Sequence, residues 1–319
     1  MRTSTILRSG TAQAISTALV GVWLAFAFFV TGLAPAWSDD VPHIHEGAGR
    51  FLFKDPEAAT GKTIAIWYYR PKSFDRNTPI LLVMHGVKRN ADLYRDNWIG
   101  LAEKHRLLIV APEFSNADFP SSWGYNLGNV ATRGPDGTLA PNPKSVWSFP
   151  IIDRVFDKVR QITGSKRTTF ALFGHSAGAQ FVHRYMTFTG GAKVELAIAA
   201  NAGWYTLPDS NEPFPYGLGQ THLSVEQVKT LLGGKLVILL GDEDTVQDQH
   251  FRMTPEAMHQ GSTRFDRGKN YFAAGRRKAA TLDTPFNWRL VLVPGVGHDN
   301  AKMAEAAAVI LKEVIVGAQ

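Results

Sequence analysis

The sequence predicts an α/β protein built on a central, mostly parallel sheet with helices on both faces. Residues 80–84 and 236–240 are runs of five apolar residues, a pattern typical of strands that are covered on both faces. Between these runs, the apolar residues of the segment 152–162 recur at helical spacing and form one stripe. Alternating strands and helices favour parallel pairing, because a crossover helix joins parallel neighbours.

The composition is that of a folded protein with a large core. The chain has 319 residues, of which 45% are hydrophobic and 19% are charged, so disorder is excluded. The sequence has no internal repeat and no Ser/Gly linker, and we expect residues 37–319 to form a single domain. Cysteine is absent, which excludes disulfides, thiolate metal sites and a cysteine nucleophile.

The N-terminus has the pattern of a secretory signal peptide. Arg2 and Arg8 precede an apolar run at 18–33, and an Ala-Pro-Ala cleavage site that ends at Ala36 follows. We therefore expect residues 1–36 to be removed after Ala36 and the protein to be secreted or periplasmic, with membrane contact only during export. The alternative is an uncleaved membrane anchor, since the run approaches the ~20 residues that span a bilayer.

The formal net charge is +6, and much of the excess lies in one segment, 252–278. There Arg252, Arg264 and Arg267 begin a run of basic residues with few acids. Such a run is usually a solvated face, so we predict no nucleic-acid partner. Whether this basic segment faces a binding site stays open from the sequence.

The first elements are expected in a regular order. Short strands are predicted at 51–53 and 62–70, followed by the apolar strand at 80–84. A helix is then predicted over 92–105, and a further strand over 107–112.

A long segment at 115–145 is rich in Gly, Pro and Asn and contains Trp123 and Tyr125. An irregular stretch of this length in a compact domain is usually functional, so we predict that it forms a pocket wall. The helix with the stripe at 152–162 follows, and Gly164 closes it.

The rest of the chain is organised around a Gly-His-Ser-Ala-Gly turn. The buried strand predicted at 169–173 runs into Gly174, Ser176 and Gly178, and apolar residues at helical spacing follow. A Cβ at either glycine would collide with the neighbouring strand or helix as the chain reverses. A serine at the centre of such a turn is held in a strained conformation with its hydroxyl exposed, so Ser176 is a candidate nucleophile.

Beyond this turn, the strand predicted at 194–200 leads into Trp204 and Tyr205. Aromatic residues at the carboxyl end of a strand face a binding crevice or cover the core, and both interpretations remain open. The segments 204–218 and 245–286 are interpreted as loops, separated by a short helix and a strand.

Two later strands end in ionisable residues. Asp242 and Asp244 follow the run at 236–240, and His298 follows the strand predicted at 289–293, ahead of a C-terminal helix. A serine hydroxyl becomes nucleophilic when an imidazole accepts its proton and a carboxylate orients that imidazole. These residues supply both groups, with the acid undecided between two aspartates.

The strand–turn–helix at Ser176 and the order of serine, acid and histidine resemble the α/β-hydrolase superfamily, from about residue 63 to the C-terminus. The resemblance implies an α/β-hydrolase fold, a mostly parallel sheet with long loops over the carboxyl ends of its strands. It implies His298 as the base. It places the acid three residues past the glycine that ends its strand, which selects Asp244 over Asp242.

The same resemblance implies an oxyanion hole made of two backbone amides. One belongs to Val87, in the loop after the strand at 80–84, and the other to Ala177, directly after the nucleophile.

The chain is also similar to secreted bacterial esterases of the polyhydroxyalkanoate depolymerase and feruloyl esterase type. We expect hydrolysis of a small-molecule or oligomeric carboxylic ester without cofactor or metal, since no His/Asp cluster has ligand spacing. The alternatives are a peptidase or amidase on the same fold, and a non-catalytic binding relative. Trp123, Tyr125, Trp204 and Tyr205 are candidate substrate contacts, and the basic segment 252–278 suggests an ester that carries a carboxylate.

Overall fold

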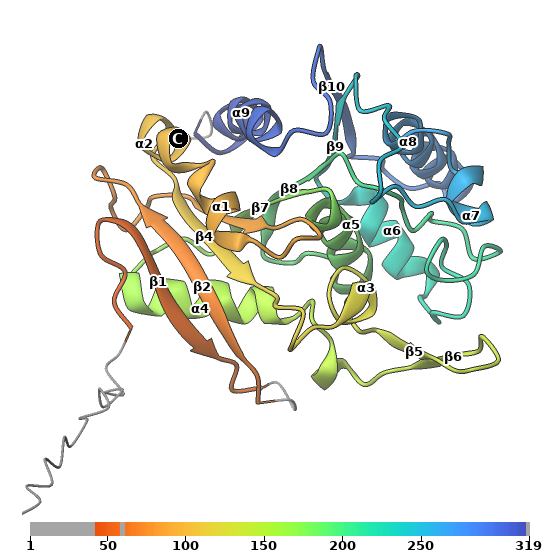
Figure 1. Ribbon diagram of the computed structural model, residues 1–319, viewed down its shortest axis with the longest axis horizontal. Helices are drawn as coiled ribbons and strands as arrows, with labels where there is room; N and C mark the ends of the chain where they lie inside the picture. The colour runs from red at the N-terminus through yellow and green to blue at the C-terminus, as the bar shows by residue number, and fades with distance from the viewer. Residues whose placement is uncertain (1–41, 58–60, 317–319) are drawn as a thin grey trace, which may run out of the picture. The chain divides into compact units, whose positions relative to one another are not determined.

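The computed structural model describes residues 42–57 and 61–316, which belong to one compact unit (Figure 1). The signal peptide and cleavage site predicted at 1–36 lie outside the described residues. No helix within the described ranges has the length and apolar character that crossing a bilayer requires.

An eight-stranded sheet forms the centre of the described fold (Figure 1). Its strands are β1 (Gly47–Lys54), β2 (Thr63–Arg70), β3 (Ile80–Met84), β4 (Leu108–Glu113), β7 (Phe170–His175), β8 (Val194–Ala200), β9 (Leu236–Gly241) and β10 (Arg289–Val293). Their order across the sheet is β1-β2-β4-β3-β7-β8-β9-β10. β2 pairs antiparallel with β1 and β4, and the other neighbours pair parallel, which confirms the predicted mostly parallel sheet.

Helices cover both faces of the sheet. They are α1 (Ala91–Asp96), α2 (Ile99–His105), α3 (Ser121–Gly124), α4 (Ile151–Thr163), α5 (Ala177–Thr189), α6 (Val225–Gly233), α7 (Pro255–His259), α8 (Arg264–Thr281) and α9 (Asn300–Leu311). Successive residues of β3 serve opposite cores. Leu82 and Met84 pack in the core with α4, α5, α6 and α8, whereas Leu81 and Val83 pack in the core with α1, α2 and α9. This double burial explains why β3 is apolar throughout.

The helix predicted over 92–105 is interrupted and forms two short helices, α1 and α2. Trp98 lies at the interruption and is fully buried, with its ring centroid 5.1 Å from that of Phe173 on the sheet. Burial of this large indole outweighs the local preference for one continuous helix.

The segment 115–145 has structure of its own, which the prediction of an irregular loop missed. It contains α3 and an antiparallel hairpin made of β5 (Ala131–Arg133) and β6 (Leu139–Pro141). Gly137, with a φ of 84°, lies in the tight connection between these strands.

The prediction of a loop over 245–286 is wrong, because this segment contains α7 and the 18-residue α8. Thr263 caps α8 by accepting a hydrogen bond from a backbone N–H of its first turn. The buried face of α8 includes Arg264, Arg267 and Tyr271 rather than an aliphatic stripe. A search for hydrophobic periodicity therefore could not detect this helix.

Candidate active site

The turn between β7 and α5 presents Ser176 at the carboxyl edge of the sheet. Ser176 has φ 59° and ψ −118°, a strained conformation for a residue with a side chain, and its N–H donates to the Ala200 carbonyl at 3.0 Å. A Cβ on Gly174 would overlap the Gly178 carbonyl, and one on Gly178 would overlap the Met84 carbonyl. The two glycines are therefore a steric requirement of this turn.

The loops after β9 and β10 bring a histidine and a carboxylate together. His298 Nδ1 lies 2.8 Å from Asp244 Oδ2, and the Asp244 side chain is only 1% exposed. Because a carboxylate only accepts, Nδ1 carries the proton and Nε2 keeps a free lone pair. Asp242 is exposed and accepts a hydrogen bond from the Gly295 N–H instead. Of the two candidate acids, Asp244 is the one that contacts His298.

Asn201, directly after β8, forms hydrogen bonds with the end of β9 and with the loop after β10, and no role was predicted for it from the sequence. Its Oδ1 accepts from the Gly241 N–H at 2.9 Å, and its Nδ2 donates to the Gly297 carbonyl at 2.9 Å. A Cβ on Gly241 would overlap the Val296 carbonyl, so the two loops also touch through their backbones. A polar residue at the end of a buried strand was the sequence signal that could have identified it.

His298 lies beside the turn that carries Ser176. Its ring centroid is 4.5 Å from that of His175, the residue before Ser176. Burial, followed by the charge of His298, holds the pKa of His175 well below its usual range, so His175 stays neutral. Within the described chain, His298 and Ser176 share no direct hydrogen bond, and such contacts are often long before substrate binds.

A cavity of about 240 Å³ opens above Ser176. Val87 and Ala177 both line it, and within the described chain neither backbone N–H donates to another protein group. Tyr125 and Trp204, two of the predicted substrate contacts, also line this cavity. The two amides that the resemblance implied therefore lie free at the same cavity as the serine.

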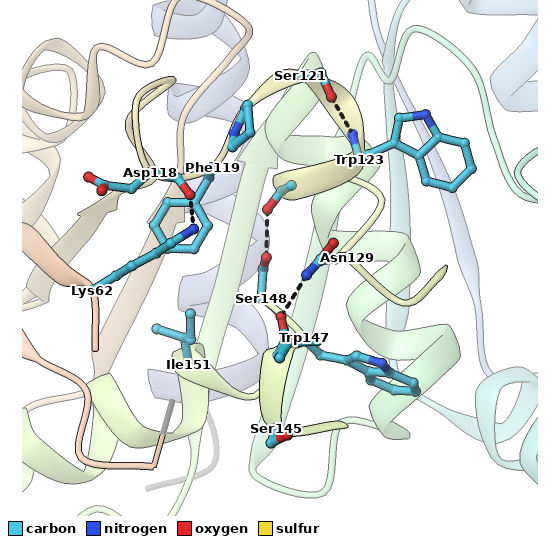
Figure 2. Close-up of a pocket in the computed structure, with 13 residues that line it drawn as sticks. Lys62, Asp118, Phe119, Ser121, Trp123, Asn129, Ser145, Trp147, Ser148 and Ile151 are labelled. Atoms are coloured by element: carbon cyan, nitrogen blue, oxygen red, sulfur yellow. Dashed lines mark hydrogen bonds between the residues drawn. The ribbon is translucent and has the colours of Figure 1, made fainter. Parts of the chain in front are cut away.

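The other two predicted contacts lie elsewhere. Tyr205 is fully buried, with its ring stacked 4.4 Å from that of Tyr271, so it covers core rather than the cavity. Trp123 lines a separate pocket of about 250 Å³ that also includes Ser121 (Figure 2). Its ring lies edge-on to Phe214, with centroids 5.9 Å apart.

The lining of the cavity above Ser176 is basic. It includes Arg89, Arg252, Arg264 and His250, and none of the lining residues is acidic. Arg89 is buried, and its guanidinium donates to the backbone carbonyls of Phe114, Phe119 and Ser121. Within the described chain Arg89 and Arg252 form no ion pair, so they contribute positive charge to the lining of the cavity, whereas Arg264 is paired with carboxylates.

The interpretation of the basic segment as a solvated face is wrong for part of it. Arg264 and Arg267 are almost completely buried, whereas Lys269, Arg276 and Arg277 are exposed on α8. Arg267 donates to the carbonyls of Gly203, Arg252 and Gly261, and its guanidinium lies 4.0 Å from the ring of Phe251. This residue holds three loops at the cavity together.

Arg264 contacts the acid that holds His298. Its Nη1 lies 3.5 Å from Asp244 Oδ1, a buried oxygen that accepts no hydrogen bond from the described residues, and its Nη2 donates to Asp248 at 2.8 Å. Both Arg264 and Asp244 are at most 2% exposed. The cation therefore balances the carboxylate charge in a place that water does not reach.

No group of three His, Cys, Asp or Glu side chains within the described ranges is arranged to hold a metal ion.

We predict that Arg264→Met destabilises the protein by about 3 kcal/mol, because removing one partner leaves a buried charge unpaired. Thermal or urea unfolding measures this change. Arg276→Met, an exposed position on the same helix, is the control and should change stability by less than about 0.5 kcal/mol. Equal stability of the two variants would show that the contact between Arg264 and Asp244 contributes nothing.

Solved structures of known hydrolases resemble this chain. Poly(aspartic acid) hydrolase-1 from Sphingomonas sp. KT-1 is 42% identical, with a TM-score of 0.79 over 84% of this chain and 99% of that one. LpqC, a poly(3-hydroxybutyrate) depolymerase from Bordetella parapertussis, is 36% identical, with a TM-score of 0.78 over 84% and 91%. An S-formylglutathione hydrolase from Agrobacterium tumefaciens, 13% identical over 85% and 96% with a TM-score of 0.53, shares the fold. No family model and no curated protein matches the sequence.

Proposed function

We propose that this member of the α/β-hydrolase superfamily of serine hydrolases cleaves carboxylic esters through an acyl-enzyme on Ser176. The observation that carries this proposal is the hydrogen bond of 2.8 Å between His298 and the buried Asp244, beside the strained turn that carries Ser176. A neutral imidazole in this setting has its Nε2 lone pair available to accept a proton.

The reaction follows from these groups. Ser176 Oγ attacks the ester carbonyl while His298 Nε2 takes its proton, and Asp244 stabilises the imidazolium that forms. The negative charge on the carbonyl oxygen is bound by the backbone N–H groups of Val87 and Ala177. His298 then protonates the leaving alcohol, and water repeats the sequence to release the acid.

Ser176→Ala should fold like the parent and lose activity by a factor on the order of 10⁶, since the nucleophile is gone. Ester turnover and labelling by a fluorophosphonate probe measure this loss, with circular dichroism as the check on folding. Retained labelling, or residual turnover of a few per cent, would contradict the assignment.

Asp244→Asn should reduce kcat by about 10⁴, because an amide favours the wrong imidazole tautomer. Asp242→Asn is the matched control, since Asp242 is exposed and contacts the Gly295 N–H rather than His298. The comparison is made at equal folded fraction. A larger loss in the Asp242 variant would transfer the role of the acid to that residue.

Two observations concern the bond that is cleaved. The similarity to LpqC, a poly(3-hydroxybutyrate) depolymerase, supports an ester. The similarity to a poly(aspartic acid) hydrolase supports a second candidate, an amide bond in a polymer that carries carboxylates. Assays of matched ester and amide substrates distinguish these two candidates.

The charge of the site supports an anionic substrate for either bond. Trp204 lies between two guanidinium groups, 4.2 Å from Arg184 and 5.7 Å from Arg252. Within the described chain neither arginine forms an ion pair, and the buried Nη2 of Arg184 has no acceptor. Burial, with a smaller contribution from Arg252, lowers the pKa of Arg184 to about 9. The two guanidinium groups repel each other, and a carboxylate on the substrate would offset that repulsion.

Arg252→Met should lower kcat/KM for an ester that carries a carboxylate by about 10- to 100-fold, the value of one charged hydrogen bond. A neutral ester of the same size should be affected far less, and added salt should slow only the anionic one. Arg276→Met on α8 is the charge-matched control. Equal losses for both esters would exclude Arg252 from carboxylate recognition.

Export also belongs to this proposal. The N-terminal pattern that ends at Ala36 supports secretion or a periplasmic location. Cleavage there would begin the mature chain at Trp37.

A further inference from the structure

His85 is a buried histidine at the end of β3 that the proposed reaction does not use. Its side chain is fully buried, next to the loop that carries Val87. Burial lowers its pKa to about 3, with a smaller effect of the Arg89 charge, so the ring is neutral at neutral pH. A permanently neutral ring does not serve as a proton shuttle.

The hydrogen bonds of His85 determine its tautomer. The Phe114 N–H donates to His85 Nε2 at 3.0 Å, so Nε2 bears the lone pair. The ring proton is therefore on Nδ1, which lies 3.0 Å from the Gly86 carbonyl oxygen and donates to it. Tyr125 completes the arrangement, because its ring stacks on His85 and its hydroxyl donates to the His85 carbonyl at 2.7 Å.

The carbonyl that His85 binds belongs to the same peptide group as the Val87 N–H. A peptide group is rigid and planar, so the direction of its carbonyl determines the direction of its N–H. The Arg89 N–H donates to the same Gly86 oxygen at 3.1 Å. Two donors on one carbonyl orient the peptide and also polarise it, which strengthens the N–H as a donor.

Gly86 allows this peptide to lie close to the nucleophile. A Cβ at this position would clash with the Tyr94 hydroxyl and would come within 3.8 Å of Ser176 Cβ. Val87 also lines the cavity above Ser176, and its N–H has no protein acceptor in the described chain.

We propose that His85 is a positioning residue of the oxyanion hole, which holds the Gly86–Val87 peptide so that the Val87 N–H meets the charge formed on the substrate carbonyl. This inference rests on the proposed serine hydrolase function. His85 contacts neither substrate nor Ser176, and acts only through the peptide that it holds.

Two variants separate this role from packing. In His85→Asn, the side-chain amide nitrogen lies as far from the backbone as Nδ1 does in histidine, so it can still donate a hydrogen bond to the Gly86 carbonyl. In His85→Gln, the side-chain amide oxygen lies as far from the backbone as Nε2 does in histidine, so it can still accept a hydrogen bond from the Phe114 N–H. Each variant loses one buried hydrogen bond, so their stabilities should fall by similar amounts.

The catalytic effects should differ. We expect His85→Gln to lose kcat by a factor on the order of 10², as for a displaced oxyanion donor, with little change in KM. His85→Asn should retain most of its kcat. The affinity for an aryl trifluoromethyl ketone, whose adduct with serine places an oxyanion in the hole, should fall in His85→Gln by the same factor as kcat/KM. The affinity for the carboxylate product should not change.

Equal kcat losses in the two variants, or unchanged affinity for the ketone in His85→Gln, would overturn the proposal. The imidazole ¹⁵N spectrum of the wild-type protein tests the same arrangement without a substitution. It should show a neutral ring protonated at Nδ1, and a ring protonated at Nε2 would refute the proposal even if neither variant folds.

The proposed function is tested separately by the wild-type protein. Absence of ester turnover and of fluorophosphonate labelling in the wild type would defeat the serine hydrolase assignment itself. Normal labelling of the wild type, combined with identical behaviour of the two His85 variants, would defeat only the role of His85.

Discussion

A backbone contact that only glycine permits places Ser176 and the loop that carries Val87 together. Gly178, in the first turn of α5, lies against the Met84 carbonyl so closely that no side chain fits between them. Met84 is the last residue of β3, and Val87 follows three residues later. The close approach of the strained turn to β3 therefore also brings Val87 to the cavity that Ser176 lines.

The positions of Asp244 and His298 depend on a second set of contacts at the same edge of the sheet. Carboxyl ends of neighbouring parallel strands meet there, so the loops after β8, β9 and β10 lie side by side. Asn201 satisfies one backbone group at the end of β9 and one in the loop after β10. A short polar side chain thus links the segments from which Asp244 and His298 form their hydrogen bond.

Sequence reasoning succeeded where burial alone determines the pattern. β3, β8 and β10 have the predicted bounds, and β3, which is covered on both faces, is apolar throughout as such a strand requires. It failed for α8, whose buried face uses Arg264 and Arg267 with backbone carbonyls and carboxylates as partners. Such partners come from distant segments, so no local pattern reveals them.

The same distinction holds for the site. The order of Ser176, Asp244 and His298 is visible in the sequence because each follows a recognisable strand. The sequence does not reveal that Trp204 lies at the cavity and Tyr205 in the core, since neighbouring residues point in different directions. The contacts of His85 could not be predicted either, because a hydrogen bond to the adjacent peptide leaves no trace in residue spacing.

Arg267 determines how the cavity responds to substrates of different size. One planar guanidinium binds carbonyls from three loops, those of Gly203, Arg252 and Gly261, and it is fully buried. A rigid group with three backbone partners prevents these loops from shifting independently. A ligand at the cavity therefore meets backbone segments that one buried side chain holds together, while Arg252 and His250 line the same cavity with their own side chains.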